Sequence, residues 1–335
     1  MQIRNTLLAA ILMTLVACGG GSSPAPAAGP TEAAAPLPSW NDGPARTAIV
    51  EFVERVTDPA SADFVPAAER IAVFDNDGTL WAEKPAYFQL FFAIEQMRAL
   101  AEADPEVAAR EPFRTLLDEG MGGLAGMDVH ALLGPLVEAA GGMPAADFEA
   151  TADAWLASSR HPERDVLYTD LVYQPMLELL DYMRAHEFQT WICSGGGIDF
   201  VRAFSEQVYG IPPEQVIGTT LELEFSDDTG LVRVAEIHHI NDGPGKPVGI
   251  ARHIGRRPIM AFGNSDGDLP MIQYATSGPG PGMGVYIHHD DAEREWAYDR
   301  ESSVGRLDVG LGMAAERGWT VVSMQQAWSQ VFPTR

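Results

Sequence analysis

Apolar positions along the chain follow two different spacings, one typical of helices and the other of strands. A recurrence every three or four residues predicts helices at residues 44–55, 129–139, 145–158 and 176–186, and helical patterns dominate from Ala86 to Met183. Short apolar runs predict strands at residues 71–74, 188–193, 221–225, 232–240, 258–262 and 284–288. Strands that alternate with helices predict an α/β fold: a doubly wound parallel sheet with a Rossmann-like core, interrupted by one inserted helical domain.

The first eighteen residues are expected to lie outside this fold. Arg4 precedes a largely apolar run over residues 7–17, which gives about 16 Å of helix, too short for a bilayer core of about 30 Å. The run ends at Leu15-Val16-Ala17-Cys18, which resembles the lipobox of bacterial lipoproteins. That resemblance implies a signal peptide over residues 1–17 and a lipid on Cys18. A plain secretory signal, or an apolar helix with a chance cysteine, is the alternative.

The segment after Cys18 has the composition of a tether. Residues 19–39 are mostly Gly, Ser, Pro and Ala, which cannot build a core, and we predict a tether over residues 18–45. Gly19, where some lipoproteins carry Asp, points by the same resemblance to a lipid anchor in the outer membrane, facing the periplasm. The remaining chain is expected to form a core from residues 46–84 and 185–335, with the helical insertion at residues 85–184.

Charge and cysteine content narrow the classes of partner. The chain has 47 acidic and 22 basic residues, a formal charge of −25, so we do not expect a nucleic-acid partner. Only two of the basic residues are lysines, Lys84 and Lys246. Cys193 is the one cysteine besides Cys18, so the fold must be stable without an internal disulfide, and its apolar neighbours predict a buried strand residue rather than a nucleophile.

Residues with chemical potential gather where the predicted strands end. Asp75 and Asp77 follow the run at 71–74, and Ser194 and Gly195 follow the run at 188–193. Two further sets come later, Lys246 within a Gly-Pro-Gly-Lys-Pro turn and the acidic turn from Gly263 to Asp268. Each set alone could be an ordinary turn or surface charge, but open α/β sheets bind ligands at the carboxyl ends of their strands.

This ordered set resembles the haloacid dehalogenase superfamily of phosphotransfer enzymes. The match consists of Asp-x-Asp-Gly-Thr, a strand-terminal Ser, a Lys and a Gly-rich acidic turn, and it covers about residues 70–290. The helical insertion looks like a type 1 cap, and the predicted hairpin at 221–240 and the Ser-Gly-Gly turn are similar to phosphoserine phosphatase relatives. The resemblance implies a Mg²⁺-dependent phosphomonoester hydrolase that works through an aspartyl-phosphate.

The resemblance also assigns roles. It makes Asp75 the nucleophile and Asp77 the general acid and base, with an alkoxide leaving group that needs a proton; dehalogenases of the superfamily lack an acid at this second position. A phosphonatase would need a lysine in the cap, and the only lysine available is Lys84, which lies close behind the Asp-x-Asp motif. The implied phosphate-binding residues are Ser194, Gly195 and Lys246, and the implied Mg²⁺ ligands are Asp75, Asp77, Asn264 and Asp268.

Asn264 departs from the family's pattern, which has aspartate there. An amide oxygen can bind Mg²⁺ but carries no charge, so we expect weaker metal affinity, compensated in part by Asp266, and Asn264→Asp is expected to tighten Mg²⁺ binding about tenfold. Glu83 is a candidate substrate contact or a cap hinge residue. The histidines at 238–239 and 288–289 suggest either a metal store or surface and structural roles.

Two functions therefore remain open. The first is a phosphomonoester hydrolase acting on small extracytoplasmic phosphates. The alternative is a non-catalytic envelope lipoprotein that uses the same fold as a binding module. The sequence of the insertion contains no recognised motif that would identify the ester.

Overall fold

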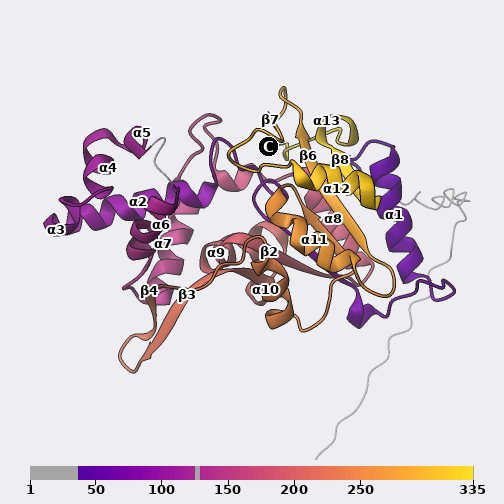
Figure 1. Cartoon of the computed structure of the whole chain (residues 1–335), viewed down its shortest axis with the longest axis horizontal. Coiled ribbons are helices and arrows are strands. Elements are labelled where there is room, and N and C mark those ends of the chain that lie inside the picture. The colour runs from indigo at the N-terminus through magenta and orange to yellow at the C-terminus, as the bar shows by residue number, and fades with distance from the viewer. Residues whose placement is uncertain (1–36, 125–128, 335) are drawn as a thin grey trace, which may run out of the picture. The chain divides into compact units, whose positions relative to one another are not determined.

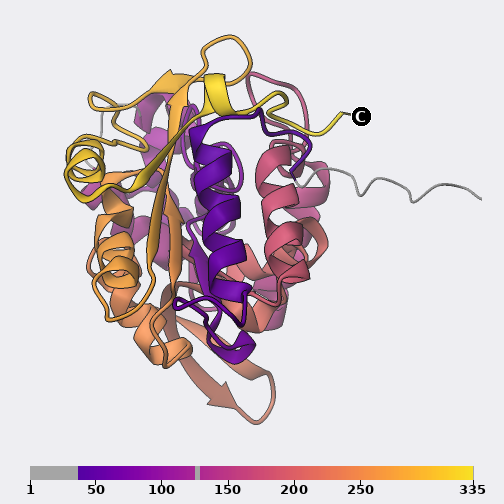
Figure 2. The ribbon, with the colours of Figure 1, turned by 90° about the vertical axis from the view of Figure 1, so that its right-hand side faces the viewer.

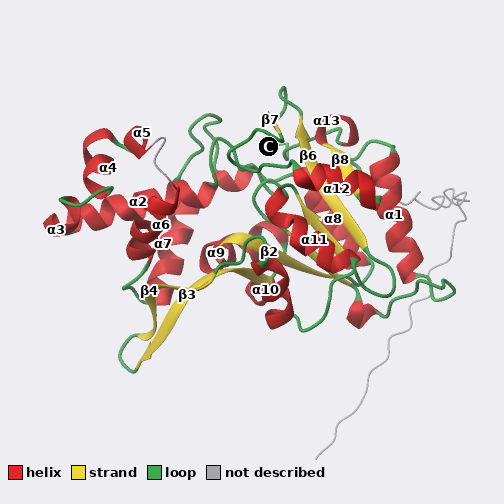
Figure 3. Ribbon diagram, viewed as in Figure 1, coloured by secondary structure: helices red, strands yellow, loops and turns green. Residues whose placement is uncertain are grey.

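The computed structural model describes residues 37–124 and 129–334, and these residues confirm the predicted α/β fold. Eight strands in the described part form one mixed sheet in the order β4-β3-β2-β1-β5-β6-β7, with β8 beside β6 (Figures 1 and 3). The neighbouring strands β3, β2, β1, β5 and β6 are parallel to one another, whereas β4 and β7 run antiparallel to their neighbours.

Each element of the described part has the following bounds. The strands are β1 Ile71–Phe74, β2 Gln189–Gly197, β3 Val216–Ser226, β4 Gly230–His239, β5 Met260–Gly263, β6 Met283–Asp290, β7 Ala297–Tyr298 and β8 Thr320–Ser323. The α-helices are α1 Pro44–Thr57, α2 Phe88–Ala103, α3 Pro105–Ala108, α4 Phe113–Glu119, α5 Met121–Leu124, α6 Val129–Ala140, α7 Ala145–Ser158, α8 Gln174–Ala185, α9 Ile198–Tyr209, α10 Gly245–His253, α11 Leu269–Thr276, α12 Val309–Arg317 and α13 Met324–Ala327.

Strand β1 lies in the middle of the sheet. It pairs in parallel with β2 on one edge and β5 on the other, so its four residues are all buried, and the predicted bounds of this strand are confirmed. A strand covered on both faces and both edges reads as a continuous apolar run, which explains why the sequence predicted it well. The ring of Phe74 stacks on that of Phe262, 4.4 Å between centroids, at the carboxyl ends of β1 and β5.

Helices cover both faces of the sheet. Alternate residues of β1 point to opposite faces: Ala72 and Phe74 pack in the cluster that contains α1, α8 and α9, and Ile71 and Val73 pack with α10, α11 and α12. Figure 2 shows α1 and α8 on one side of the strands and α11 on the other. The residues at the ends of the central strands are therefore held between two packed layers.

The insertion between β1 and β2 contains helices α2 to α7, several of which share an apolar cluster that includes Met97 and Phe113. Trp81, before α2, and Val172, before α8, form an isolated bridge that joins the two ends of the insertion. Helix α8 packs in the core cluster through residues such as Leu179 and Met183. The predicted end of the insertion at residue 184 stays a prediction; α8, which ends one residue beyond it, contacts β2 of the sheet.

The N-terminal boundary differs from the prediction. Leu37 and Trp40 are buried, and the Trp40 Nε1 atom donates a hydrogen bond of 2.9 Å to the Pro175 carbonyl oxygen. The predicted tether, which runs to residue 45, is therefore too long. Its composition is dominated by small residues, but the two large apolar side chains near its end pack into the core. The signal peptide, Cys18 and residues 19–36 of the predicted tether lie outside the described residues. Within the described residues, no helix combines the length and apolarity needed to cross a membrane.

Candidate active site

The structure brings Lys246 between two of the predicted carboxylates. Lys246 is in the first turn of α10 and only 1% exposed; its Nζ atom lies 2.6 Å from Asp75 Oδ1 and 2.5 Å from Asp268 Oδ1. Asp75 directly follows β1, and Asp268 follows β5, the next strand in the sheet. One buried cation thus joins the ends of the two central strands.

Burial and charge shift the acidity of this triad. Loss of water around Asp75, followed by the neighbouring negative charge of Asp268, raises the pKa of Asp75 well above its usual value. Burial alone would lower the pKa of Lys246, but the carboxylates of Asp268 and Asp75 raise it well above its usual value. Lys246 therefore stays charged, and its charge opposes part of the upward shift in the pKa of Asp75.

Asp77 follows Asp75 by two residues and is held by an aromatic side chain. The Trp81 Nε1 atom donates a hydrogen bond of 2.9 Å to Asp77 Oδ1. Burial raises the pKa of Asp77, although this hydrogen bond opposes the shift. Its carboxyl group therefore keeps a proton to higher pH than an exposed aspartate, which is the state required of a general acid.

Ser194 faces Asp77 across a glycine. A methyl group placed on Gly196 would lie 3.2 Å from Ser194 Oγ and 3.9 Å from Asp77 Oδ2, so both side chains border the same small space. The Gly196 nitrogen donates to Ser194 Oγ at 3.0 Å, and Thr219 Oγ1 donates to the Gly195 carbonyl oxygen at 2.7 Å. The Ser-Gly-Gly segment, predicted as a turn, forms the irregular carboxyl end of β2 in the structure and is anchored beside the carboxylates.

Gln89, in the first turn of α2, is a site residue that sequence reasoning missed. Its Oε1 atom accepts a hydrogen bond of 2.7 Å from the Gly197 nitrogen, and a methyl group on Gly196 would lie 2.8 Å from the same oxygen. The insertion therefore contributes a polar side chain at this turn. A single glutamine within a helical pattern gives no sequence signal of such a contact.

The acidic turn after β5 is held together by Asp268. Its Oδ2 atom accepts hydrogen bonds of 3.0 Å from the nitrogens of Asn264 and Ser265, while Oδ1 binds Lys246. Asp266 instead accepts from the main-chain nitrogens of residues 308, 309 and 310, at the start of α12. Because Asp266 is committed to that helix, it does not compensate for the charge that Asn264 lacks.

Asn264 and Glu83 are paired inside the protein. The Asn264 Nδ2 atom donates to Glu83 Oε1 at 2.6 Å, and Thr79 Oγ1 donates to Asn264 Oδ1 at 3.2 Å. Glu83 is 1% exposed and also accepts a 2.7 Å hydrogen bond from the Tyr298 hydroxyl. Burial raises the pKa of Glu83 to about 7. The structure thus places Glu83 against protein groups, which differs from the substrate contact considered above.

His289 occupies a buried position next to this pair. Its Nε2 atom donates to the Gly78 carbonyl oxygen at 2.8 Å, and Nδ1 lies 3.1 Å from Glu295 Oε2. Burial lowers the pKa of His289, but the carboxylates of Glu295 and Glu83 and the bond to the Gly78 carbonyl oxygen together raise it above its usual value. In residues 37–124 and 129–334, no three His, Cys, Asp or Glu side chains are grouped to hold a metal ion, so the metal-store interpretation of the histidines finds no support there.

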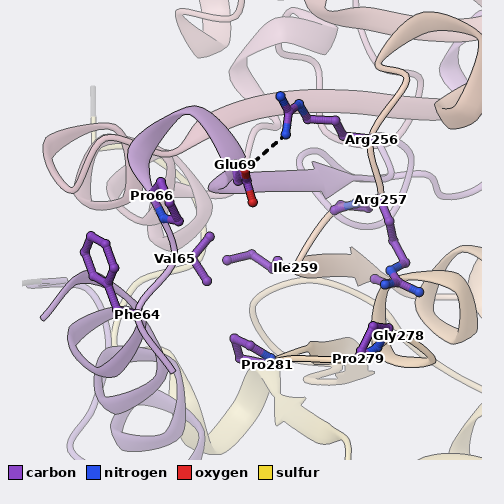
Figure 4. Close-up of a pocket in the computed structure, with 12 residues that line it drawn as sticks. Phe64, Val65, Pro66, Glu69, Arg256, Arg257, Ile259, Gly278, Pro279 and Pro281 are labelled. Carbon is purple, nitrogen blue, oxygen red and sulfur yellow. Dashed lines mark ion pairs between the residues drawn. The ribbon is translucent and has the colours of Figure 1, made fainter. Parts of the chain in front are cut away.

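Cys193 is an unreactive residue, and one pocket lies apart from the carboxylates. Burial raises the pKa of the Cys193 thiol to about 12, as expected for an inert strand residue. A pocket of about 390 Å³ is lined by residues that include Phe64, Glu69, Arg256 and Ile259 (Figure 4). Glu69 and Ile259 precede β1 and β5, so this pocket lies at the amino ends of the strands, opposite the end that carries Asp75.

A family model identifies the chain. The model for the haloacid dehalogenase-like hydrolase matches residues 72–273, more than half of the chain, from within β1 to within α11, and this span contains Asp75, Ser194, Lys246 and Asp268. The chain belongs to the haloacid dehalogenase-like hydrolase family. No curated protein matches the sequence significantly.

Three solved structures are similar to this haloacid dehalogenase-like hydrolase, and the first of them shares its fold. A conserved protein of unknown function from Anaerococcus prevotii DSM 20548 is 16% identical, with a TM-score of 0.54 over 83% of this chain and 91% of that chain. A protein of unknown function from Bordetella pertussis Tohama I is 15% identical, with a TM-score of 0.48 over 76% and 99%. A phosphoserine phosphohydrolase-like protein from Francisella tularensis subsp. tularensis SCHU S4 is 14% identical, with a TM-score of 0.37 over 66% and 88%.

Proposed function

We propose that this hydrolase cleaves small phosphomonoesters with Mg²⁺ as cofactor and an aspartyl-phosphate on Asp75 as intermediate. The observation that carries the proposal is the position of Lys246, a buried cation between Asp75 and Asp268 at the carboxyl ends of β1 and β5. A carboxylate can attack a dianionic phosphate only where positive charge offsets the repulsion, and this triad provides it.

The residues divide the reaction between them. Asp75 attacks phosphorus while Asp77 gives its proton to the leaving alkoxide oxygen, and Asp77 then takes a proton from the water that hydrolyses the aspartyl-phosphate. The raised pKa of Asp77 supports the acid step, and an acid at this position favours phosphate esters over halides. Lys246, Ser194 and Gly195 bind the non-bridging oxygens.

The donor set fits Mg²⁺. The Asp75 carboxylate, the Asp77 main-chain carbonyl and the Asn264 amide offer oxygen only, the type of ligand that a hard cation prefers. Asp268 is better suited to holding Lys246 and the turn, since both its oxygens already accept hydrogen bonds. Bound Mg²⁺ supplies positive charge that reduces repulsion between the nucleophile and the phosphate.

The rest of the chain suggests where the hydrolase acts and how it selects an ester. We propose that Cys18 carries the lipid, that the protein faces the periplasm from the outer membrane, and that helices α2 to α7 form a cap over the site. The approach of Gln89 to the turn at Gly196 and Gly197 supports contact between the cap and the phosphate end of the substrate.

Hydrolysis of p-nitrophenyl phosphate by the purified protein, with Mg²⁺ and with EDTA, tests the activity. We expect turnover with Mg²⁺ that is lost with EDTA, and a panel of phosphomonoesters then identifies the preferred one. The alternative, a non-catalytic binding module, is favoured only by Asn264. It predicts that phosphate binds without turnover of any ester in the panel, a result that would refute the enzymatic proposal.

A further inference from the structure

The Glu83–Asn264 pair occupies a space that the backbone leaves open on two sides. Gly78 has a φ of +73° and Gly305 a φ of +65°, the left-handed region that favours glycine. A methyl group on Gly78 would lie 2.0 Å from Asn264 Nδ2, and one on Gly305 would lie 1.8 Å from Glu83 Oε1. Two glycines from distant segments therefore make room for this one contact, so the pair is a built feature of the site.

The pair also restores a charge. Asn264 stands where the family's pattern carries a metal-binding aspartate, and Glu83 brings a carboxylate to 2.6 Å from its amide nitrogen. We propose that Glu83 is a positioning residue for the metal. Glu83 binds Asn264 rather than the cation, and it supplies from behind Asn264 the negative charge that position 264 lacks. The inference rests on the proposed Mg²⁺-dependent function and concerns the same site.

Glu83 also fixes which end of the Asn264 amide faces the site. An amide can turn over and exchange its oxygen and nitrogen, and a nitrogen turned toward a cation would repel it. Glu83 Oε1 accepts a hydrogen bond of 2.7 Å from the Tyr298 hydroxyl, so this oxygen acts as an acceptor. If the Asn264 amide turned over, its oxygen would lie 2.6 Å from Glu83 Oε1, and two acceptors would face each other. The nitrogen therefore stays on Glu83 and the oxygen on the side of Thr79, where it is available as a ligand.

Surrounding residues keep Glu83 in place. The Tyr298 ring stacks on His289 with 4.3 Å between centroids, and His289 holds the Gly78 carbonyl oxygen. The Lys84 ammonium lies 4.0 Å from the centroid of the Tyr298 ring. Tyr298 of β7, which binds the carboxylate, is thus itself packed against His289 of β6 and Lys84, and this limits the freedom of Glu83 to swing toward solvent.

An exchange of the two side chains tests the inference. Mg²⁺ dissociation constants are measured by calorimetry at pH 8, without substrate, for the wild type, E83Q and the double variant E83Q/N264D, with E69Q as a control. Burial raises the pKa of Glu83 to about 7, so its carboxyl group is mostly ionised at pH 8. E69Q makes the same change at a glutamate paired with Arg256 on the surface. We expect E83Q to weaken Mg²⁺ binding about tenfold, E69Q to leave it unchanged, and the double variant to recover at least the wild-type affinity, because it again has one carboxylate and one amide.

The outcomes separate this inference from the proposed function. Wild-type Mg²⁺ binding with E83Q unchanged, or a double variant no tighter than E83Q, would overturn the role of Glu83 and leave the hydrolase proposal standing. A wild type that binds no Mg²⁺ would refute both. Urea denaturation of every variant accompanies the titrations; if E83Q does not fold, recovery of folding and binding in E83Q/N264D supports the exchange, and failure of both overturns it.

Discussion

Lys246→Met removes the cation that joins Asp75 and Asp268 and keeps most of the side-chain volume. The lysine is 1% exposed, and its ammonium lies 2.6 and 2.5 Å from the two carboxylates, so the variant leaves two buried acids facing each other without a counter-charge. Breaking a buried ion pair by removing one partner costs about 3–5 kcal/mol. Since a domain is stable by roughly 5–15 kcal/mol, the variant should be close to unfolding at neutral pH.

The pH dependence follows from the direction of the pKa shift. The folded-state pKa of Asp75 is raised above the usual value of 3.8, so ionised Asp75 costs stability, and this cost appears as pH rises through the raised pKa. Lys246 lowers the pKa of Asp75 and offsets part of the cost in the wild type. Without Lys246 the cost is uncompensated, so the stability difference between variant and wild type should grow from pH 5 to pH 8.

Urea denaturation in EDTA at pH 5 and pH 8 measures this difference. Lys84→Met is the matched control, because Lys84 is the other lysine and its Nζ atom bonds only neutral groups, Ser302 Oγ and the Val304 carbonyl oxygen. A loss below about 1 kcal/mol at pH 8, in the range of a surface pair, would refute the structural role given to the triad. An equal loss at both pH values would refute the electrostatic explanation.

Three further predictions concern other residues. Asp75→Asn should lower hydrolysis of p-nitrophenyl phosphate on the order of a thousandfold or more, because the nucleophile is lost, while the urea midpoint stays near that of the wild type; wild-type turnover without deamidation would remove Asp75 from the mechanism. Cys18→Ser should abolish incorporation of a lipid label and release the protein from the membrane fraction, and unchanged labelling would exclude the anchor. Asp266→Ala should lower stability by about 1–2 kcal/mol, since it removes the acceptor of three main-chain nitrogens at α12; an unchanged melting temperature would contradict that assignment.

The sequence predicted the parts of the site that follow an apolar run directly. Asp75 and Ser194 each stand at the end of an apolar run, and the parallel sheet brings the ends of such runs together. Lys246 was identified because lysine is scarce in this chain. These features depend on local pattern and fold class, which one sequence contains.

The groups that support the site gave no such pattern. Glu83 is 181 residues from Asn264 and 215 residues from Tyr298 in the chain, so nothing local marks them as partners. The hydrogen bonds of Asn264 change one expectation in particular. Asn264→Asp alone would set a second carboxylate beside Glu83 rather than simply add charge at the metal, so the tenfold gain in affinity expected from sequence does not follow.

The central position of β1 has a consequence for how the chain folds during synthesis. β1 is the first strand to be made, yet both strands that cover its edges come later, from Gln189 and from Met260. Until residue 263 has left the ribosome, four apolar residues have at least one uncovered edge, the kind of surface that promotes aggregation. Chains that stop before β5 should therefore need a chaperone to remain soluble, and Asp75, the proposed nucleophile that they carry, cannot be in its final place.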